Sequence, residues 1–494
     1  MTDPIANTTA GPVRGVAADG VLRFLAVPYA AAPVGELRFA APAPPVPWTA
    51  PRDATSPGPT APQLGRPFPA LDLAPVVGEG WRKGDDYLNA CVWTPDLAAR
   101  GLPVMVFIHG GAFLGGCADA SAYDGAAFAR SGVVLISISY RVGIEGFVPV
   151  PGAPTNLGLR DQIAALHWVR DNAAAFGGDP ANVTVFGESA GAMSVADLIG
   201  SPLTEGLFRR AIVQSGHGSM VHPLSASLPM IERLAVMLGV APTRDGFAAA
   251  PLEACVEAVA NLAAAGFSTP DAEGRDPGHG LSPFRPVWGD DVLPLLPLDA
   301  AATGAGKQVD LLIGANLDEL NLYFVPTGVR QGADAAMATA MLQASEPAAG
   351  AILADYGLGD ASTTPGDALT RAMTDLVFRL PARRFAAAHP GRSHVYEYGW
   401  RSPALEGQLG ACHGLELPFV FDTLASAVGP SGLLGPTAPP KDLADRIHRV
   451  WVDFARDGTL PWPEYDLETR QIYRLETGHA DREDAIAAER HTSP

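Results

Sequence analysis

Residues 183–199 read VTVFGESAGAMSVADLI, and this stretch decides the fold. The apolar run at 183–186 is typical of a buried strand, and residues 190–199 have the composition of a helix. Between them, Gly187-Glu188-Ser189-Ala190-Gly191 fits the pattern G-x-S-x-G. Small residues around the serine allow a sharp turn from strand to helix, which lifts the serine hydroxyl above the sheet. The stretch therefore predicts a reactive serine, Ser189, in a fold that joins strands to helices.

The segments around it continue the alternation of strands and helices. Residues 104–109 (VMVFIH) and 133–139 (VVLISIS) are short apolar runs, as expected for strands covered on both faces. Residues 162–176 have apolar positions at helical spacing and end at Gly177-Gly178, a common helix stop. This alternation predicts an α/β fold, with a mostly parallel sheet covered by helices on both faces. Later elements are predicted as strands at 309–313 and 394–398 and a helix at 441–456.

Length and composition set further bounds. The chain has 494 residues, of which 47% are apolar, and large α/β proteins often form one unit of this length, so we expect a single domain over 1–494. The proline-rich stretches 41–51 and 57–69 are predicted to form a long surface loop. No run of about 18 uncharged apolar residues occurs, so no membrane span is expected. The N-terminus is acidic where a signal peptide would be basic, which favours a cytoplasmic protein.

Charge and cysteine content exclude several partners. The net charge is −19, from 34 basic and 53 acidic residues, and nucleic-acid phosphates would repel such a chain. The cysteines are not spaced as metal ligands or as a disulfide framework, so we expect mostly free thiols in a reducing compartment. No metal or cofactor is expected, and no oligomeric state is predicted. The four cysteines are Cys91, Cys117, Cys255 and Cys412.

A serine nucleophile needs an anion site and a base. Residues 109–113 (HGGAF) directly follow a predicted buried strand and match the H-G-G-x loop that supplies backbone N–H groups to an oxyanion hole, together with the amide of the residue after the nucleophile. Each such donor typically contributes about 3–4 kcal/mol of transition-state stabilisation. The base and its acid should follow the serine in the order acid, then histidine. Spacing alone leaves a short list of histidines: His217, His222, His279, His389, His394, His413, His448 and His479.

Longer segments make the chain resemble the type-B carboxylesterase and cholinesterase family. Residues 176–191 (FGGDPANVTVFGESAG) fit the family's serine signature at every constrained position. Residues 27–29 and 33–39 (VPY, PVGELRF) are similar to its N-terminal segment, and residues 156–162 (NLGLRDQ) to its N-x-G-x-x-D-Q stretch. Residues 451–455 and 462–463 resemble its closing helix and loop. The resemblance spans most of the chain and implies the α/β-hydrolase fold.

The resemblance also implies partners for Ser189. The family's acid is a Glu in a G-x-x-x-D-E-G segment, and residues 314–320 (GANLDEL) align with it, so Glu319 is the implied acid and Asp318 the alternative; Leu320 replaces the last glycine. The family's histidine lies in an H-G-x-E segment, which His413 matches. The implied oxyanion amides are those of Gly111, Ala112 and Ala190. Two further residues match supporting positions: Ser215, which in the family hydrogen-bonds the acid, and Glu188 beside the nucleophile.

The chain also departs from the family. Tyr87 stands where secreted members have a disulfide cysteine, and Val77 falls near the place of the tryptophan with which cholinesterases hold quaternary ammonium groups. Choline esters are therefore disfavoured. Small residues near the aligned acyl-pocket aromatics predict a roomy acyl site, and nearby histidines could accept a polar acyl group. The acyl-pocket candidates are His217, Met220, His222, Gly280 and Ser282.

These observations predict a hydrolase that cleaves small to medium neutral carboxylic esters through a serine acyl-enzyme. An amidase or carbamate hydrolase would use the same triad with a different leaving group. A non-catalytic binding protein related to cholinesterases is the remote alternative, although such proteins generally lack the nucleophile, which is present here. The only partner implied is a small-molecule ester.

Overall fold

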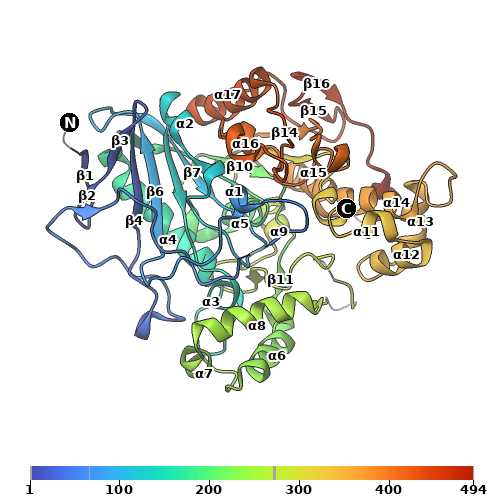
Figure 1. Cartoon of the computed structure of the whole chain (residues 1–494), viewed down its shortest axis with the longest axis horizontal. Coiled ribbons are helices and arrows are strands. Elements are labelled where there is room, and N and C mark those ends of the chain that lie inside the picture. Colours follow the sequence, from blue (N-terminus) through green and yellow to red (C-terminus); the bar gives the residue numbers. More distant parts are fainter. Residues whose placement is uncertain (1–2, 66, 271–273, 277, 493–494) are drawn as a thin grey trace.

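A mixed sheet of 11 strands forms the centre of the molecule, with helices on both of its faces (Figure 1). The computed structural model describes the chain except residues 1–2, 66, 271–273, 277 and 493–494. The strand order is β16-β15-β14-β13-β10-β9-β7-β8-β6-β4-β3. From β15 to β8 all neighbours are parallel, and the strands at both edges are antiparallel. The predicted α/β-hydrolase fold is confirmed.

The strands of this sheet are short at the edges and longest at the centre. Two small sheets accompany it: β1 (Ile5–Asn7), β2 (Pro12–Arg14) and β5 (Arg52–Asp53), and β11 (His222–Pro223) with β12 (Val287–Trp288). The main strands are β3 (Val16–Ala18), β4 (Val21–Pro28), β6 (Asn89–Thr94), β7 (Leu102–Ile108), β8 (Val134–Ile138), β9 (Gly178–Glu188), β10 (Arg210–Gln214), β13 (Asp310–Asn316), β14 (Ser393–Tyr398), β15 (Gln471–Arg474) and β16 (His479–Arg482).

Both faces of the sheet are buried, and the central strands supply apolar residues to each of them. In β7, Val104 and Val106 pack into one hydrophobic core, while Met105 and Phe107 pack into the other. Successive strand residues point to opposite faces, so a continuous apolar run supplies two cores at once. This is why the predicted strand segments show no alternation of polar and apolar residues.

Different helices cover the two faces of the sheet. The first core includes side chains from α4 and α5, and the second includes side chains from α2, α16 and α17. Helices α6 to α8 and α11 to α14 form two groups beside the sheet (Figure 1). No helix in the described part of the chain is long and apolar enough to cross a membrane. The helices are α1 (Ala74–Val77), α2 (Ala126–Arg130), α3 (Gly143–Phe147), α4 (Leu157–Asn172), α5 (Ala190–Gly200), α6 (Leu228–Leu238), α7 (Arg244–Ala249), α8 (Leu252–Ala264), α9 (Pro297–Ala302), α10 (Asn321–Phe324), α11 (Val329–Gly332), α12 (Ala335–Gln343), α13 (Ala349–Asp355), α14 (Pro365–Thr374), α15 (Leu380–Ala388), α16 (Leu417–Val420) and α17 (Lys441–Asp457).

The predicted elements are present, with shifted ends. The helix predicted at 162–176 starts five residues earlier, at Leu157, and its last turn is a separate 3-10 segment, Ala173–Phe176. The strand predicted at 183–186 is part of the longer β9, which begins at Gly178. The prediction of a surface loop at 57–69 is only partly right, because Thr60, Ala61 and Gln63 are buried.

A buried ion pair joins the loop that follows β8 to helix α4. Arg141 and Asp161 are both almost fully buried, and the guanidinium donates to Asp161 at 2.8 Å and 2.7 Å. The backbone N–H of Arg141 also donates to this carboxylate, at 3.0 Å. Breaking one partner of a buried pair leaves the other charge uncompensated, which costs about 3–5 kcal/mol.

We therefore expect Asp161→Asn to lower the free energy of unfolding by about 3–5 kcal/mol, measured by chemical denaturation. Asp171→Asn is the matched control on the same chain segment, because Asp171 is about half exposed and paired with Arg170; it should change stability by less than about 0.5 kcal/mol. Equal effects of the two substitutions would contradict this reading of the buried pair.

Candidate active site

Ser189 sits on a strained turn between β9 and α5. Its backbone has φ 56° and ψ −124°, a conformation that costs energy for any residue with a Cβ. The turn is enforced by two glycines that touch neighbouring backbone: a Cβ on Gly191 would lie 2.0 Å from the Ile108 carbonyl oxygen, and one on Gly187 would lie 2.5 Å from the Gly191 carbonyl carbon. The Ser189 N–H donates to the Gln214 carbonyl at 2.9 Å. Sequence and packing thus hold the serine above the ends of the parallel strands.

The loop after β7 folds over the serine with an unusual backbone. Gly111, Ala112 and Phe113 have φ values of 112°, 57° and 60°, which is a rare conformation for residues with a Cβ such as Ala112 and Phe113. Gly111 and Ala112 line the same cavity as Ser189 and Ala190. As the first residue of α5, Ala190 has no acceptor for its N–H within the helix. The three residues predicted to supply the oxyanion hole therefore line the same cavity as Ser189.

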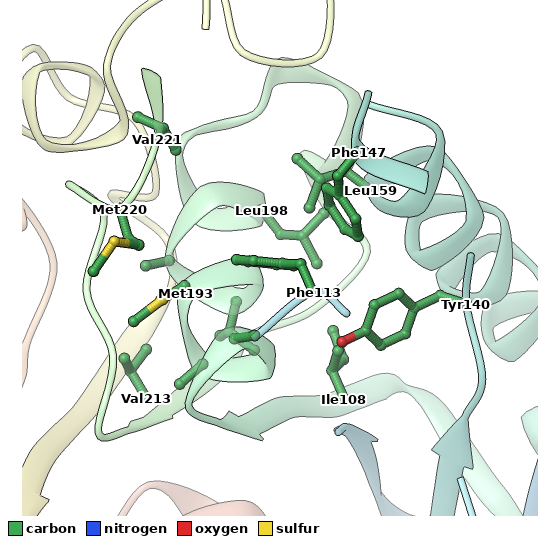
Figure 2. Packing of buried hydrophobic residues seen from close by; sticks show 14 of the residues in the cluster. Ile108, Phe113, Tyr140, Phe147, Leu159, Met193, Leu198, Val213, Met220 and Val221 are labelled. Atoms are coloured by element: carbon green, nitrogen blue, oxygen red, sulfur yellow. The ribbon is translucent and has the colours of Figure 1, made fainter. Parts of the chain in front are cut away.

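Neighbouring side chains hold this loop in place. The Gln63 side chain accepts from the Gly116 N–H at 2.7 Å and donates to the Gly116 carbonyl at 2.8 Å. The Ser282 hydroxyl donates to the Ala112 carbonyl at 2.8 Å. Figure 2 shows the Phe113 side chain inserted beside α5, and its ring lies 4.5 Å from that of Phe147. The loop is thus fixed from three sides before any substrate binds.

The acid and the histidine meet as the resemblance implies. Glu319 is fully buried, and its Oε2 lies 2.6 Å from His413 Nδ1. Its Oε1 accepts from the Asn316 N–H at 2.7 Å. The alternative acid, Asp318, instead pairs with Arg401 at 2.7 Å and does not reach the histidine. The structure thus brings Glu319 to His413.

The other side of the imidazole faces Glu188. His413 Nε2 lies 3.1 Å from Glu188 Oε1, although the angles are not those of a hydrogen bond. In this structure His413 Nε2 and Ser189 Oγ are not hydrogen-bonded to each other, and both groups line one cavity. Such bonds are often long without substrate and tighten when it binds.

Burial and neighbouring charges set the pKa of His413. Burial by itself lowers the pKa of the imidazole, but the carboxylates of Glu188 and Glu319 outweigh it and raise the pKa of His413 to about 9. Burial raises the pKa of the Glu188 carboxyl to about 8, although the neighbouring imidazolium acts to lower it. The imidazole is thus held between two carboxyl groups in a buried site, where charge interactions are stronger than in water.

A third carboxyl group, Glu416, supports this arrangement and was not predicted. Its oxygens accept from Gln214 Nε2 at 3.0 Å and from Asn316 Nδ2 at 2.7 Å. The same Asn316 amide donates to the Cys412 carbonyl at 2.8 Å, directly before His413. The glutamate of the H-G-x-E segment could have indicated it. Burial raises the pKa of the Glu416 carboxyl.

One supporting residue does not act as predicted. Ser215 is fully buried, but its hydroxyl has no hydrogen-bond partner among the described residues, so it does not bond Glu319. Its N–H donates to the Gly314 carbonyl, and Asn316 takes the place beside the acid. The predicted hydrogen bond between Ser215 and the acid is therefore wrong.

All four cysteines are buried free thiols.

The cavity above Ser189 has a volume of about 690 Å³ and mostly apolar walls. Met220, Gly280 and Ser282 lie on its wall, as predicted for the acyl side. His217 and His222 do not, and the prediction that they accept a polar acyl group is wrong. His217 Nε2 bonds the Val377 carbonyl at 2.8 Å and His222 Nε2 the Ser227 hydroxyl at 3.1 Å. Apolar or mixed walls are also formed by Leu73, Val76, Leu281, Leu322, Phe324, Phe378 and Leu433.

The sequence and the fold are shared with known proteins. A family model described as the carboxylesterase family matches residues 2–491. The chain belongs to the carboxylesterase family. The para-nitrobenzyl esterase of Bacillus subtilis (strain 168) is 36% identical over 492 residues, which cover 97% of this chain and 96% of that protein. The phenmedipham hydrolase of Pseudarthrobacter oxydans is 34% identical and covers 94% of this chain and 93% of that protein.

Solved structures agree with this membership. A PNB esterase structure matches with a TM-score of 0.85 at 33% identity, covering 100% of both chains. A carboxylesterase of Geobacillus stearothermophilus at pH 6.2 matches with a TM-score of 0.83 at 32% identity, covering 99% of this chain and 98% of that one. The predicted family and enzyme class are therefore confirmed: the chain is a carboxylic ester hydrolase.

The oxyanion loop yields a direct prediction. A Cβ on Gly111 would lie 2.2 Å from the Gly115 carbonyl oxygen, so Gly111→Ala must move the loop. We expect kcat on a p-nitrophenyl ester to fall about 10²-fold, as for loss of one oxyanion donor. Gly101→Ala is the control, since Gly101 also has positive φ (74°) but open space around it. Unchanged kcat in the Gly111 variant would contradict the placement of the amides.

Proposed function

We propose that this carboxylesterase cleaves small to medium neutral esters through an acyl-enzyme on Ser189, with His413 as the base and Glu319 as the acid that orients it. The observation that carries the proposal is the short contact between Glu319 and His413, whose imidazole lines one cavity with a serine held on a strained turn. Each residue alone has a structural explanation. A structural role does not explain why Ser189, Glu319 and His413 meet beside a loop with positive φ values.

The proposed mechanism gives each of these groups one role. His413 Nε2 takes the hydroxyl proton as Ser189 Oγ attacks the ester carbonyl carbon, while Glu319 at Nδ1 holds the tautomer and stabilises the imidazolium. The amides of Gly111, Ala112 and Ala190 donate to the oxyanion of the tetrahedral intermediate. The imidazolium then protonates the leaving alcohol, and water repeats the sequence to release the carboxylic acid.

The walls of the cavity support the preference for neutral esters. Its lining is mostly apolar, and the carboxyl group of Glu188 lies at the reaction centre, where it would repel an anionic acyl group when ionised. Gly280 and Ser282 leave space where larger side chains would narrow the acyl side. The relatives named as esterases support an ester over an amide as substrate. A cytoplasmic location and a single domain over 1–494 remain part of this proposal.

Substitution of the nucleophile tests the assignment. Ser189→Ala should lower turnover of a p-nitrophenyl ester on the order of 10⁶-fold, because the residues of such a triad act as a unit. Circular dichroism should show an unchanged fold, and the exposed Ser431→Ala should keep wild-type turnover. Substantial turnover by the Ser189 variant, with contamination excluded, would refute the proposal.

The pH profile tests the charge environment of His413. Only a neutral imidazole can accept the serine proton, so kcat/KM should rise with pH up to about 9, the raised pKa of His413. Glu188→Gln removes one of the three carboxylates that raise this pKa. The rising limb should therefore move to lower pH in that variant. The exposed Glu205→Gln serves as control, and a limb that stays in place or moves to higher pH in Glu188→Gln would contradict the account.

A further inference from the structure

A single π-helical turn interrupts the long helix beside the active site. Asp375–Arg379 forms this π-turn between α14 and α15, and the Leu380 N–H donates to the Asp375 carbonyl five residues back. Pro381 lies at the start of α15 and has no N–H. The carbonyl of Val377, four residues earlier, therefore cannot receive the usual helical hydrogen bond from residue 381. Isolated turns of this kind occur frequently at functional sites.

Two groups of the π-turn, the Val377 carbonyl and the Phe378 side chain, make contacts outside the helix. The Val377 carbonyl accepts from His217 Nε2 at 2.8 Å, which ties the turn to the segment that follows β10. The next side chain, Phe378, lines the active-site cavity, and its ring centre lies 4.8 Å from that of the His413 imidazole. The Tyr323 ring also contacts the imidazole, at 5.7 Å. The imidazole thus has an aromatic ring from the π-turn packed against it.

The same helix also holds the acid. The hydroxyl oxygen of Thr374, the last residue of α14, accepts from the Leu320 N–H at 3.2 Å. Leu320 directly follows Glu319, so this bond fixes the backbone from which the acid projects. One helical segment therefore contacts the histidine through a ring and the acid's backbone through a hydroxyl.

A buried ion network anchors the π-turn. Arg379, its last residue, pairs with Glu397 of β14 at 2.7 Å and with Asp375. Arg383, one turn later, pairs with Glu483 at 2.8 Å and with Glu397 at 3.2 Å. Moving these arginines away from their carboxylates would cost energy, because each charge would lose its partner inside the protein. The turn is thereby fixed to the sheet.

We infer that the π-turn is a positioning element for the acid–base pair, with Phe378 and Thr374 as its positioning residues. Phe378 blocks rotation of the His413 ring away from Ser189, and Thr374 fixes the backbone of Glu319. The inference rests on the proposed roles of Ser189, Glu319 and His413. It adds a function for a segment without a reactive group.

The test compares two phenylalanines of this helical segment. Phe378→Leu should lower kcat on p-nitrophenyl acetate about tenfold, with KM within about twofold of wild type, because small misplacements of catalytic groups are costly. The pH profile of kcat should also shift, since water would reach the imidazole. Phe385→Leu, in α15, is the control: Phe385 is equally buried but lines no part of the cavity, and its kcat and pH profile should match wild type.

The ring itself is tested by two more variants. Phe378→Tyr keeps an aromatic ring and should retain kcat within about threefold, and Phe378→Met, which keeps most of the volume, replaces Phe378→Leu if that protein does not fold. Wild-type kcat and pH profile in Phe378→Leu, or in Phe378→Met where it replaces that variant, would overturn the inference, as would an equal loss in Phe385→Leu. Absence of ester turnover in the wild type would instead refute the proposed function.

Discussion

The end of β7 and the turn that carries Ser189 lie so close together that no side chain fits between them. A Cβ on Gly191 would overlap the Ile108 carbonyl, and a Cβ on Gly110 would lie 2.6 Å from Glu188 Oε2. This close approach places the oxyanion loop, which continues β7, directly over the nucleophile. It also forces Ser189 into a backbone conformation that only the surrounding core can maintain. The rest of the site is arranged around this contact.

Around that contact the protein buries three carboxyl groups with one imidazole. Glu188, Glu319 and Glu416 are all buried, and each raises the energy of placing another negative charge nearby. A protonated His413 relieves this repulsion, so the environment favours the imidazolium that forms during the reaction. The side-chain amides of Asn316 and Gln214 donate to Glu416 and stabilise its carboxyl group without adding charge. The site is therefore electrostatically prepared for the charge that develops on the histidine.

The sequence predicted the parts of this site that depend on local pattern. The strand, the turn and the helix around Ser189 were visible because each has its own periodicity and glycine requirement. Glu319 and His413 came only from the family resemblance, since nothing local distinguishes one buried histidine from another. The contacts of His217 and Ser215 were mispredicted, because they depend on where Val377 of the π-turn and Asn316 lie in three dimensions. The π-turn was also not predicted, since its contacts include an ion pair between Arg383 and Glu483, which are 100 residues apart in the sequence.

The central claim is that Ser189 is the single activated nucleophile of the molecule. Its most direct test is reaction of the native protein with a p-nitrophenyl organophosphonate, followed by peptide mass spectrometry. We predict one equivalent of adduct, located on Ser189, with loss of ester turnover in proportion to labelling. No adduct, or an adduct on another residue that accompanies the loss of turnover, would contradict the account.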